Sequence, residues 1–267
     1  MKAPLDGSIL ARQAAEARLD GASIIVRSLP EDGSEAREAT LEPAREIYPA
    51  SMIKTPLVAA VLADVADGRL ALEQTFTVSQ SNMTFNDAPS PLHAGATARL
   101  DELCDLSISR SDNVATNVLF DVVGRERATG IVRERYGLSH TAFHRKLSGS
   151  DPLIADPGWD GVHRNAHPTR DAATLFTLVA LDRVPRSDIL RGALVRQYWN
   201  DKLSKGVRPG DRFAHKTGDT NDVTHDGGIL MTAEGRSYVV VVYTPMSSTD
   251  AHNARFKPFM AALRKYL

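Results

Sequence analysis

The stretch 49-PASMIKTPL-57 places a serine and a lysine three residues apart at the start of an apolar run. The apolar pattern predicts a helix from Ser51 to about residue 67, ended by Gly68. Positions three apart lie on one face of a helix, so the Lys54 ammonium can reach the Ser51 hydroxyl. The stretch therefore indicates either a nucleophilic serine with a lysine base or, in the plainer interpretation, a solvated lysine.

Two further short motifs follow along the chain. Ser111-Asp112-Asn113 falls at a break between predicted helices over 99–111 and 113–124, where a helix cap is the plainer interpretation. Lys216-Thr217-Gly218 falls on a predicted strand over 211–218, where an ordinary edge strand is the plainer interpretation. If this strand binds a ligand, its glycine lets the ligand backbone approach closely.

Predicted strands lie at both ends of the chain and predicted helices lie in the middle. Beyond the elements already named, we expect helices over 5–20, 170–182 and 251–267, strands over 22–29, 36–48, 227–232 and 236–244, and a long loop over 145–169. This order predicts an α/β (α+β) fold with one sheet built from both ends and an inserted all-helical lobe. We expect a sheet domain from 1–48 and 200–267, a helical domain from 49–199, and an active site in the cleft between them.

Composition excludes several classes of function. The chain has 267 residues, a net charge of −1 and a sequence pI near 6.7, so nothing suggests a nucleic-acid partner. No apolar stretch approaches the roughly 18 residues of a membrane span. The N-terminal residues lack the apolar core of a signal peptide, which predicts a cytoplasmic protein unless a leader has been removed. Cys104 is the only cysteine, and we expect it to be a buried structural thiol.

The three motifs in this order resemble those of the class A β-lactamases and penicillin-binding proteins. Three longer stretches extend the resemblance over most of the chain: 96-ATARLDELCDLSISRSDNVATNVLF-120, 168-PTRDAATLF-176 and 210-GDRFAHKTGDTNDVTHDGGIL-230. The resemblance implies a β-lactamase/transpeptidase-like fold with an antiparallel sheet flanked by helices. It also implies a monomer that needs no metal or organic cofactor and takes a small acyl substrate, either a β-lactam or a peptide-like compound.

The resemblance also implies a role for each motif residue in acylation. Ser51 would attack the substrate carbonyl and carry the acyl group, with Lys54 as its base. Ser111 would pass a proton to the leaving nitrogen, helped by Lys216. The backbone N–H groups of Ser51 and Asp219 would form the oxyanion hole.

Substrate binding is implied for three more positions. Asn113 would hold a side-chain amide of the substrate, and Thr217 would bind its carboxylate. Gly218 would leave room for the substrate backbone beside the strand.

The sequence departs from the class A pattern in the loop after the second motif. Class A enzymes carry a glutamate there that activates the deacylating water. In 141-TAFHRKL-147 the corresponding position is Leu147, and no glutamate occurs between Glu134 and Glu234. Because leucine cannot deprotonate water, we expect impaired deacylation, since the loss of a general base typically costs about 10²–10⁴-fold.

Other groups in the loop could act as a substitute base, and solvated loop residues are the plainer interpretation of each. The carboxylates are Asp151, Asp156 and Asp160, and the imidazoles are His163 and His167. The pairs His140/His144 and His163/His167 have a four-residue spacing that could suit a metal. Gly and Pro near the second pair disfavour a helix there, and no further ligand cluster is evident, so no metal is expected.

A second departure follows the third motif. Class A enzymes often supply an arginine on the next strand to hold the substrate carboxylate, but here that region reads 225-HDGG-228 and Asp219 adds a negative charge. His215 alternates to the face of the strand opposite Lys216 and is interpreted as packing. Three functions therefore stay open: a β-lactamase with altered deacylation, a D-Ala peptidase, amidase or esterase using the same serine, or a covalent β-lactam sensor without turnover.

Overall fold

The computed structural model describes residues 5–30, 36–148 and 154–267 and divides into two compact units. The first unit comprises Met1–Met52, Pro168–Thr177 and Trp199–Leu267, and the second comprises Ile53–His167 and Leu178–Tyr198. The predicted division into 1–48 plus 200–267 and 49–199, with an active site between the two parts, stays a prediction.

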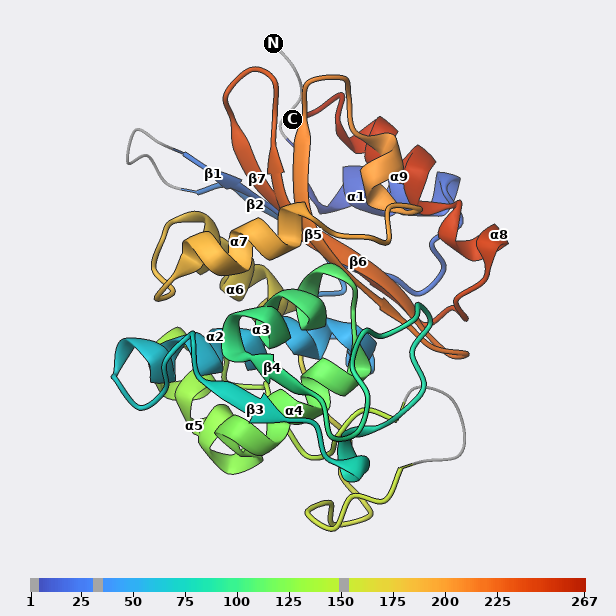
Figure 1. Cartoon of the computed structure of the whole chain (residues 1–267). Coiled ribbons are helices and arrows are strands. Elements are labelled where there is room, and N and C mark those ends of the chain that lie inside the picture. The colour runs from blue at the N-terminus through green and yellow to red at the C-terminus, as the bar shows by residue number, and fades with distance from the viewer. Residues whose placement is uncertain (1–4, 31–35, 149–153) are drawn as a thin grey trace. The chain divides into compact units, whose positions relative to one another are not determined.

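The first unit contains a five-stranded antiparallel sheet in the order β2-β1-β7-β6-β5 (Figure 1). Its strands are β1 (Ser23–Leu29), β2 (Glu38–Leu41), β5 (Arg212–Asp219), β6 (Thr224–Met231) and β7 (Ser237–Thr244). The central strand β7, with sequence SYVVVVYT, is buried along almost its whole length, as its run of valines favours. The predicted α/β fold with an antiparallel sheet flanked by helices is confirmed.

Helices from both ends of the chain cover one face of this sheet. α1 (Gly7–Glu16) and α9 (Phe256–Leu263) contact each other beside the strands (Figure 1). Asp6 caps α1 by accepting a hydrogen bond from the Ile9 N–H (3.0 Å). Leu10 and Phe259 from the helices share a buried cluster with Ile24, Phe213 and Val242 from the strands. Alternate residues of β5, beginning at Phe213, therefore face this helical layer.

The second unit is built around α2 (Lys54–Ala66), which follows the 3₁₀ turn η1 (Ala50–Ile53) without a break. Residues Lys54 to Asp64 of α2 are all buried, as expected for a helix that is apolar on every side. Its neighbours are α3 (Leu100–Ser109), α4 (Asn113–Val123), α5 (Arg125–Tyr136) and α7 (Ser187–Val195). The predicted helix over 51–67 is confirmed, and Gly68 follows it with a φ of +72°.

Several elements have other bounds than the sequence predicted. The strand expected over 36–48 is only Glu38–Leu41, because a turn containing Pro43 follows it. The closing helix expected over 251–267 is two helices, α8 (Asp250–Asn253) and α9. α5, α7 and the two-stranded sheet of β3 and β4 were not predicted. The elements not yet introduced are β3 (Thr75–Thr77), η2 (Gln80–Asn82), β4 (Thr97–Arg99), α6 (Thr169–Ala180) and η3 (Leu203–Gly206).

Cys104 is buried, as predicted, and burial raises the pKa of its thiol to about 12. Among the described residues, no helix is both long enough and apolar enough to cross a membrane.

Candidate active site

Lys54 donates three hydrogen bonds to the Ser111-Asp112-Asn113 turn. Its Nζ donates to the Ser111 backbone O (2.6 Å), the Ser111 Oγ (3.1 Å) and the Asn113 Oδ1 (2.7 Å). The side chain is fully buried, and burial lowers the pKa of the ammonium from 10.5 to about 7, although the charges of Asp112 and Asp87 act in the opposite direction. The interpretation of Lys54 as a solvated lysine is therefore wrong.

The Ser111-Asp112-Asn113 turn is shaped by its own side chains. Ser111 has a left-handed φ of +58°, and Asp112 caps α4 by accepting from the Ala115 N–H (2.9 Å). The Asn113 Nδ2 donates to the backbone O of Phe85 (2.8 Å), which fixes the orientation of its amide. The helix-cap interpretation of the motif is thus correct, and the same turn presents Ser111 and Asn113 to Lys54.

In the first unit, the segment before α2 packs against the Lys216-Thr217-Gly218 strand. A Cβ atom at Gly218 would lie 2.8 Å from the Pro49 backbone O and 3.0 Å from the Met52 Cγ. Only glycine fits at this distance, so Gly218 lets the chain on either side of Ser51 lie against β5. Ala50, directly before Ser51, has a left-handed φ of +48°, which is unfavourable for alanine.

His225 tethers this segment to the sheet and was not predicted to do so. Its Nδ1 accepts from the Thr244 N–H (3.1 Å), so the Nε2 carries the proton and donates to the Tyr48 backbone O (2.8 Å). The ring stacks on Tyr243 with a centroid separation of 4.2 Å. Burial lowers the pKa of His225 to about 4, so the imidazole stays neutral at physiological pH.

The free energy of unfolding is expected to fall as the pH drops from about 6.5 to about 4. In this range the unfolded chain binds a proton at residue 225 but the folded chain does not, so stability present above pH 6.5 is lost. Lowering the pKa of His225 from 6.5 to about 4 corresponds to a loss of about 3 kcal/mol in the free energy of unfolding. Urea unfolding across this range measures it, and the pH dependence should be shallower in His225→Gln. It should be unchanged in His93→Gln, an exposed control, and equal slopes in all three proteins would contradict the expectation.

Lys216 and Thr217 occupy the middle of β5. Lys216 is fully buried, lies opposite Gly227 in the sheet, and its Nζ donates to the Thr217 backbone O (2.8 Å). Thr217 lies opposite Asp226. The structure thus brings Lys54, Ser111 and Asn113 together in one unit, and the chain around Ser51 and the third motif together in the other. Ser51 and Lys54 themselves are joined by the unbroken run from η1 into α2.

Lys202 is another buried lysine, and no sequence motif predicted it. Its Nζ donates to the Asp219 Oδ1 (2.5 Å) and to the His225 backbone O (3.0 Å). Burial alone would raise the pKa of Asp219, but the charge and hydrogen bond of Lys202 outweigh it and lower the pKa. Lys202 precedes the strand without any motif around it, so only the fold reveals the pair.

Leu147 is held in place by a single asparagine. Asn117 accepts a hydrogen bond from the Leu147 N–H at its Oδ1 (2.8 Å) and donates to the Leu147 O from its Nδ2 (2.8 Å). Both backbone groups of residue 147 are therefore fixed, and the leucine side chain is buried at 7% exposure. The backbone position of residue 147 is therefore fixed by α4, on which Asn117 lies.

The candidate substitute bases lie in different surroundings. Asp156 accepts from the Lys146 N–H (2.7 Å) and pairs with Arg125. Burial would raise the pKa of Asp156, but these contacts outweigh it and lower the pKa. His167 is buried with its Nδ1 2.9 Å from the Thr141 Oγ1, and burial lowers its pKa to about 3. Both groups are weak bases at neutral pH, which favours structural roles.

The three other candidates are exposed or lie outside the described residues. His163 is exposed, and its Nδ1 lies 2.6 Å from the Asp160 Oδ2. This contact and two backbone hydrogen bonds hold the pKa of Asp160 below its usual range. Asp151 lies outside the described residues. Whether any of these groups serves as a deacylation base stays a prediction.

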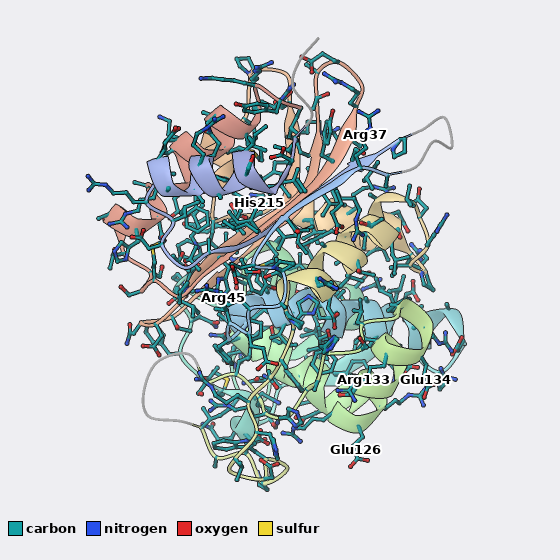
Figure 2. The ribbon with its side chains drawn as sticks, turned by 180° about the vertical axis from the view of Figure 1, so that it is seen from behind. Arg37, Arg45, Glu126, Arg133, Glu134 and His215 are labelled. Carbon is teal, nitrogen blue, oxygen red and sulfur yellow. The ribbon has the colours of Figure 1, made fainter. Side chains whose placement is uncertain are left out.

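His215 is buried, in keeping with its interpretation as packing (Figure 2). Its ring stacks on Phe213 at 4.7 Å, its Nδ1 lies 2.7 Å from the Asp226 Oδ1, and its Nε2 lies 3.0 Å from the Asn200 Oδ1. In the part of the chain that the structure describes, no group of three or more His, Cys, Asp or Glu residues could hold a metal ion.

Comparison with known proteins gives one family. A family model described as "Beta-lactamase enzyme family" matches residues 10–262. The extended-spectrum β-lactamase PER-1 of Pseudomonas aeruginosa is 25% identical over 214 residues, which cover 75% of this chain and 68% of that protein.

Solved structures share the fold over nearly the whole chain. PBP-A, as a leucine-to-glutamate variant in an acyl-enzyme complex with penicillin G, has a TM-score of 0.82 at 22% identity, covering 99% of this chain and 97% of that one. A β-lactamase from Sphaerobacter thermophilus has a TM-score of 0.80 at 24% identity, covering 98% and 97%. At these identities the likeness establishes the fold.

Proposed function

Because the chain belongs to the β-lactamase enzyme family, a family of hydrolases, we propose that it is a serine acyl hydrolase that opens β-lactam amides through an acyl group on Ser51. Family membership confirms the resemblance drawn from the three motifs. The observation that carries the proposal is Lys54, a buried lysine with a pKa lowered to about 7 and contacts to Ser111 and Asn113. A base whose pKa lies near the working pH is suited to proton transfer.

The proposed acylation begins with neutral Lys54. Its amine takes the Oγ proton of Ser51 as that oxygen attacks the substrate carbonyl carbon, and the backbone N–H groups of Ser51 and Asp219 bind the developing oxyanion. The C–N bond then breaks. The leaving nitrogen takes a proton from the Ser111 hydroxyl, which recovers one from the Lys54 ammonium 3.1 Å away. Lys216 supplies positive charge that assists this transfer.

The proposed substrate contacts follow from unused hydrogen-bonding capacity and from the position of β5. Asn113 gives one Nδ2 hydrogen to Phe85, and its second can donate to a carbonyl of the substrate. β5 is the last strand in the sheet order, so the backbone at Thr217 and Gly218 can pair with an extended substrate.

Leu147 supports a long-lived acyl-enzyme. A buried leucine, held by Asn117, stands where class A enzymes carry a base, so we propose slow or altered release of the acyl group. The same serine could then act as a D-Ala peptidase, an amidase or an esterase, or the protein could be a covalent sensor. PBP-A, whose fold this chain shares, has been captured as an acyl-enzyme with penicillin G in its leucine-to-glutamate variant.

Intact-mass measurement tests the nucleophile. After incubation with benzylpenicillin, nitrocefin or a p-nitrophenyl ester, the protein should gain the mass of one acyl group, mapped to Ser51 by peptide analysis. Ser51→Ala should gain none, and Ser139→Ala, which removes an exposed serine hydroxyl, should behave as the unaltered protein. If no adduct or product forms with any of the three compounds, the proposal is wrong.

The decay of the adduct separates the functions. Loss of the acyl group within seconds indicates a hydrolase, decay that depends on the acyl donor indicates another acyl-transfer enzyme, and persistence for hours indicates a sensor.

A further inference from the structure

The surroundings of Thr217 on its face of the sheet are rich in carboxylates. Asp226 lies directly opposite Thr217 on β6, and Asp219 lies two residues further along β5 on the same face. Both carboxylates belong to the first unit, as Thr217 does. Thr217 is 2% exposed and Asp226 is fully buried, so the carboxylate that a ligand group meets at this end of β5 is that of Asp219, whose side chain is partly exposed.

The lysines near Thr217 are held by other groups: Lys216, on the opposite face of β5, donates to the Thr217 backbone O (2.8 Å), and Lys202 is paired with Asp219. The Lys202 Nζ lies 2.5 Å from the Asp219 Oδ1 and also donates to the His225 backbone O. The His215 Nδ1 lies 2.7 Å from the Asp226 Oδ1, and its ring is buried. Neither Lys202 nor His215 offers an uncompensated positive charge to an anionic ligand.

The Lys202–Asp219 pair exposes its negative end. The Lys202 side chain is 1% exposed, whereas the Asp219 side chain is 28% exposed. Asp219 also accepts from the Thr224 Oγ1 (3.0 Å), which helps to hold it on this face. An incoming group therefore contacts the carboxylate of Asp219 and not the ammonium of Lys202.

We propose that the position beside Thr217 takes acyl donors whose group there is uncharged or positively charged, such as an ester, a carboxamide or an amine, and disfavours a carboxylate. This inference rests on the proposed acyl-serine function and narrows its substrate class. It replaces the expectation, drawn from the family resemblance, that Thr217 binds a substrate carboxylate. Asp219 acts here as a specificity-determining residue.

Benzylpenicillin and its methyl ester form a matched pair of probes, because they deliver the same acyl skeleton to Ser51 and differ in one negative charge. The second-order rate constant of Ser51 acylation is measured by intact mass for each compound with the full chain. The ester is expected to react about tenfold faster or more, because placing like charges together costs at least this factor.

The variant Asp219→Asn removes the charge and keeps the size and the backbone N–H of the residue. Its ester-to-acid rate ratio should fall by about tenfold or more relative to the unaltered protein. Asp222→Asn removes one negative charge from an exposed residue of the same hairpin and should leave the ratio unchanged. Thermal unfolding of both variants shows whether they keep the fold. The comparison of the ester and acid rates in the unaltered protein does not depend on any variant.

The outcomes separate the two levels of the proposal. If the acid reacts as fast as the ester, or if Asp219→Asn leaves the ratio unchanged while adducts form on Ser51, the substrate class is wrong and the acyl-serine function stands. If neither compound labels Ser51 and p-nitrophenyl esters also fail, the function itself is wrong and the inference falls with it. The proposal is supported if the unaltered protein prefers the ester, Asp222→Asn keeps this preference and Asp219→Asn abolishes it.

Discussion

Replacing Lys54 with methionine is expected to slow acylation of Ser51 by about 10²–10⁴-fold, the usual contribution of a general base. Methionine fills a similar buried volume but cannot accept the Ser51 proton or return one to Ser111. The Ser111 and Asn113 oxygens also lose a donor, at a cost of about 1–3 kcal/mol each in stability. Acylation is measured by mass spectrometry at a temperature where the variant is folded.

The pH dependence adds a second measurement. Because only neutral Lys54 acts as a base and its pKa is about 7, the acylation rate should rise about tenfold per pH unit below pH 7 and level off above it. Lys146→Met is a suitable control, since Lys146 is also a buried lysine of the second unit and pairs with Asp121 (2.7 Å). A rate independent of pH around neutrality, or equal losses in both variants, would show that Lys54 is not the base.

Leu147→Glu is expected to speed loss of the acyl group by about 10²–10⁴-fold, because it places a carboxylate where the sequence resemblance predicts the class A glutamate. Asn117 fixes both backbone groups of residue 147, so the new side chain starts from a defined backbone position. Burial favours a raised pKa for a carboxyl here, which suits a base, and costs about 1–3 kcal/mol of stability. The decay of the benzylpenicillin adduct and steady-state nitrocefin turnover measure the effect.

Leu147→Gln is the matched control for this experiment. Glutamine has the shape of glutamate but cannot deprotonate water, so its adduct should persist as in the unaltered protein. Equal decay in the glutamate and glutamine variants would mean that a carboxylate at residue 147 does not act on the acyl bond.

The features that sequence alone could predict are those encoded locally. The helix after Ser51 and strand β7 are long apolar runs, so their type was clear from periodicity. α5 was missed because its sequence, RERATGIVRERY, is mostly polar and gives little apolar pattern. Figure 2 shows Glu126, Arg133 and Glu134 on this helix, and Arg133 still anchors it to the following loop through the Thr141 backbone O (2.9 Å).

The parts of the candidate site that sequence could not predict depend on contacts between distant segments. His225 reaches Tyr48 across 177 residues of chain, and neither residue belongs to a motif. The Lys202–Asp219 pair forms because the chain before β5 turns back onto that strand, and no spacing rule relates the two residues. Motifs predict which residues carry the chemistry, whereas the charge presented to a substrate depends on the partners that the fold supplies.

The burial of Cys104 has a practical consequence for spectroscopy. It is the only cysteine in the chain, and burial raises its pKa to about 12, so at neutral pH it offers almost no thiolate to a maleimide or an iodoacetamide dye. The unaltered sequence is therefore a ready background for attaching one fluorophore or spin label at an introduced surface cysteine. Such a label would follow the proposed loading and release of an acyl group in real time without first removing a native thiol.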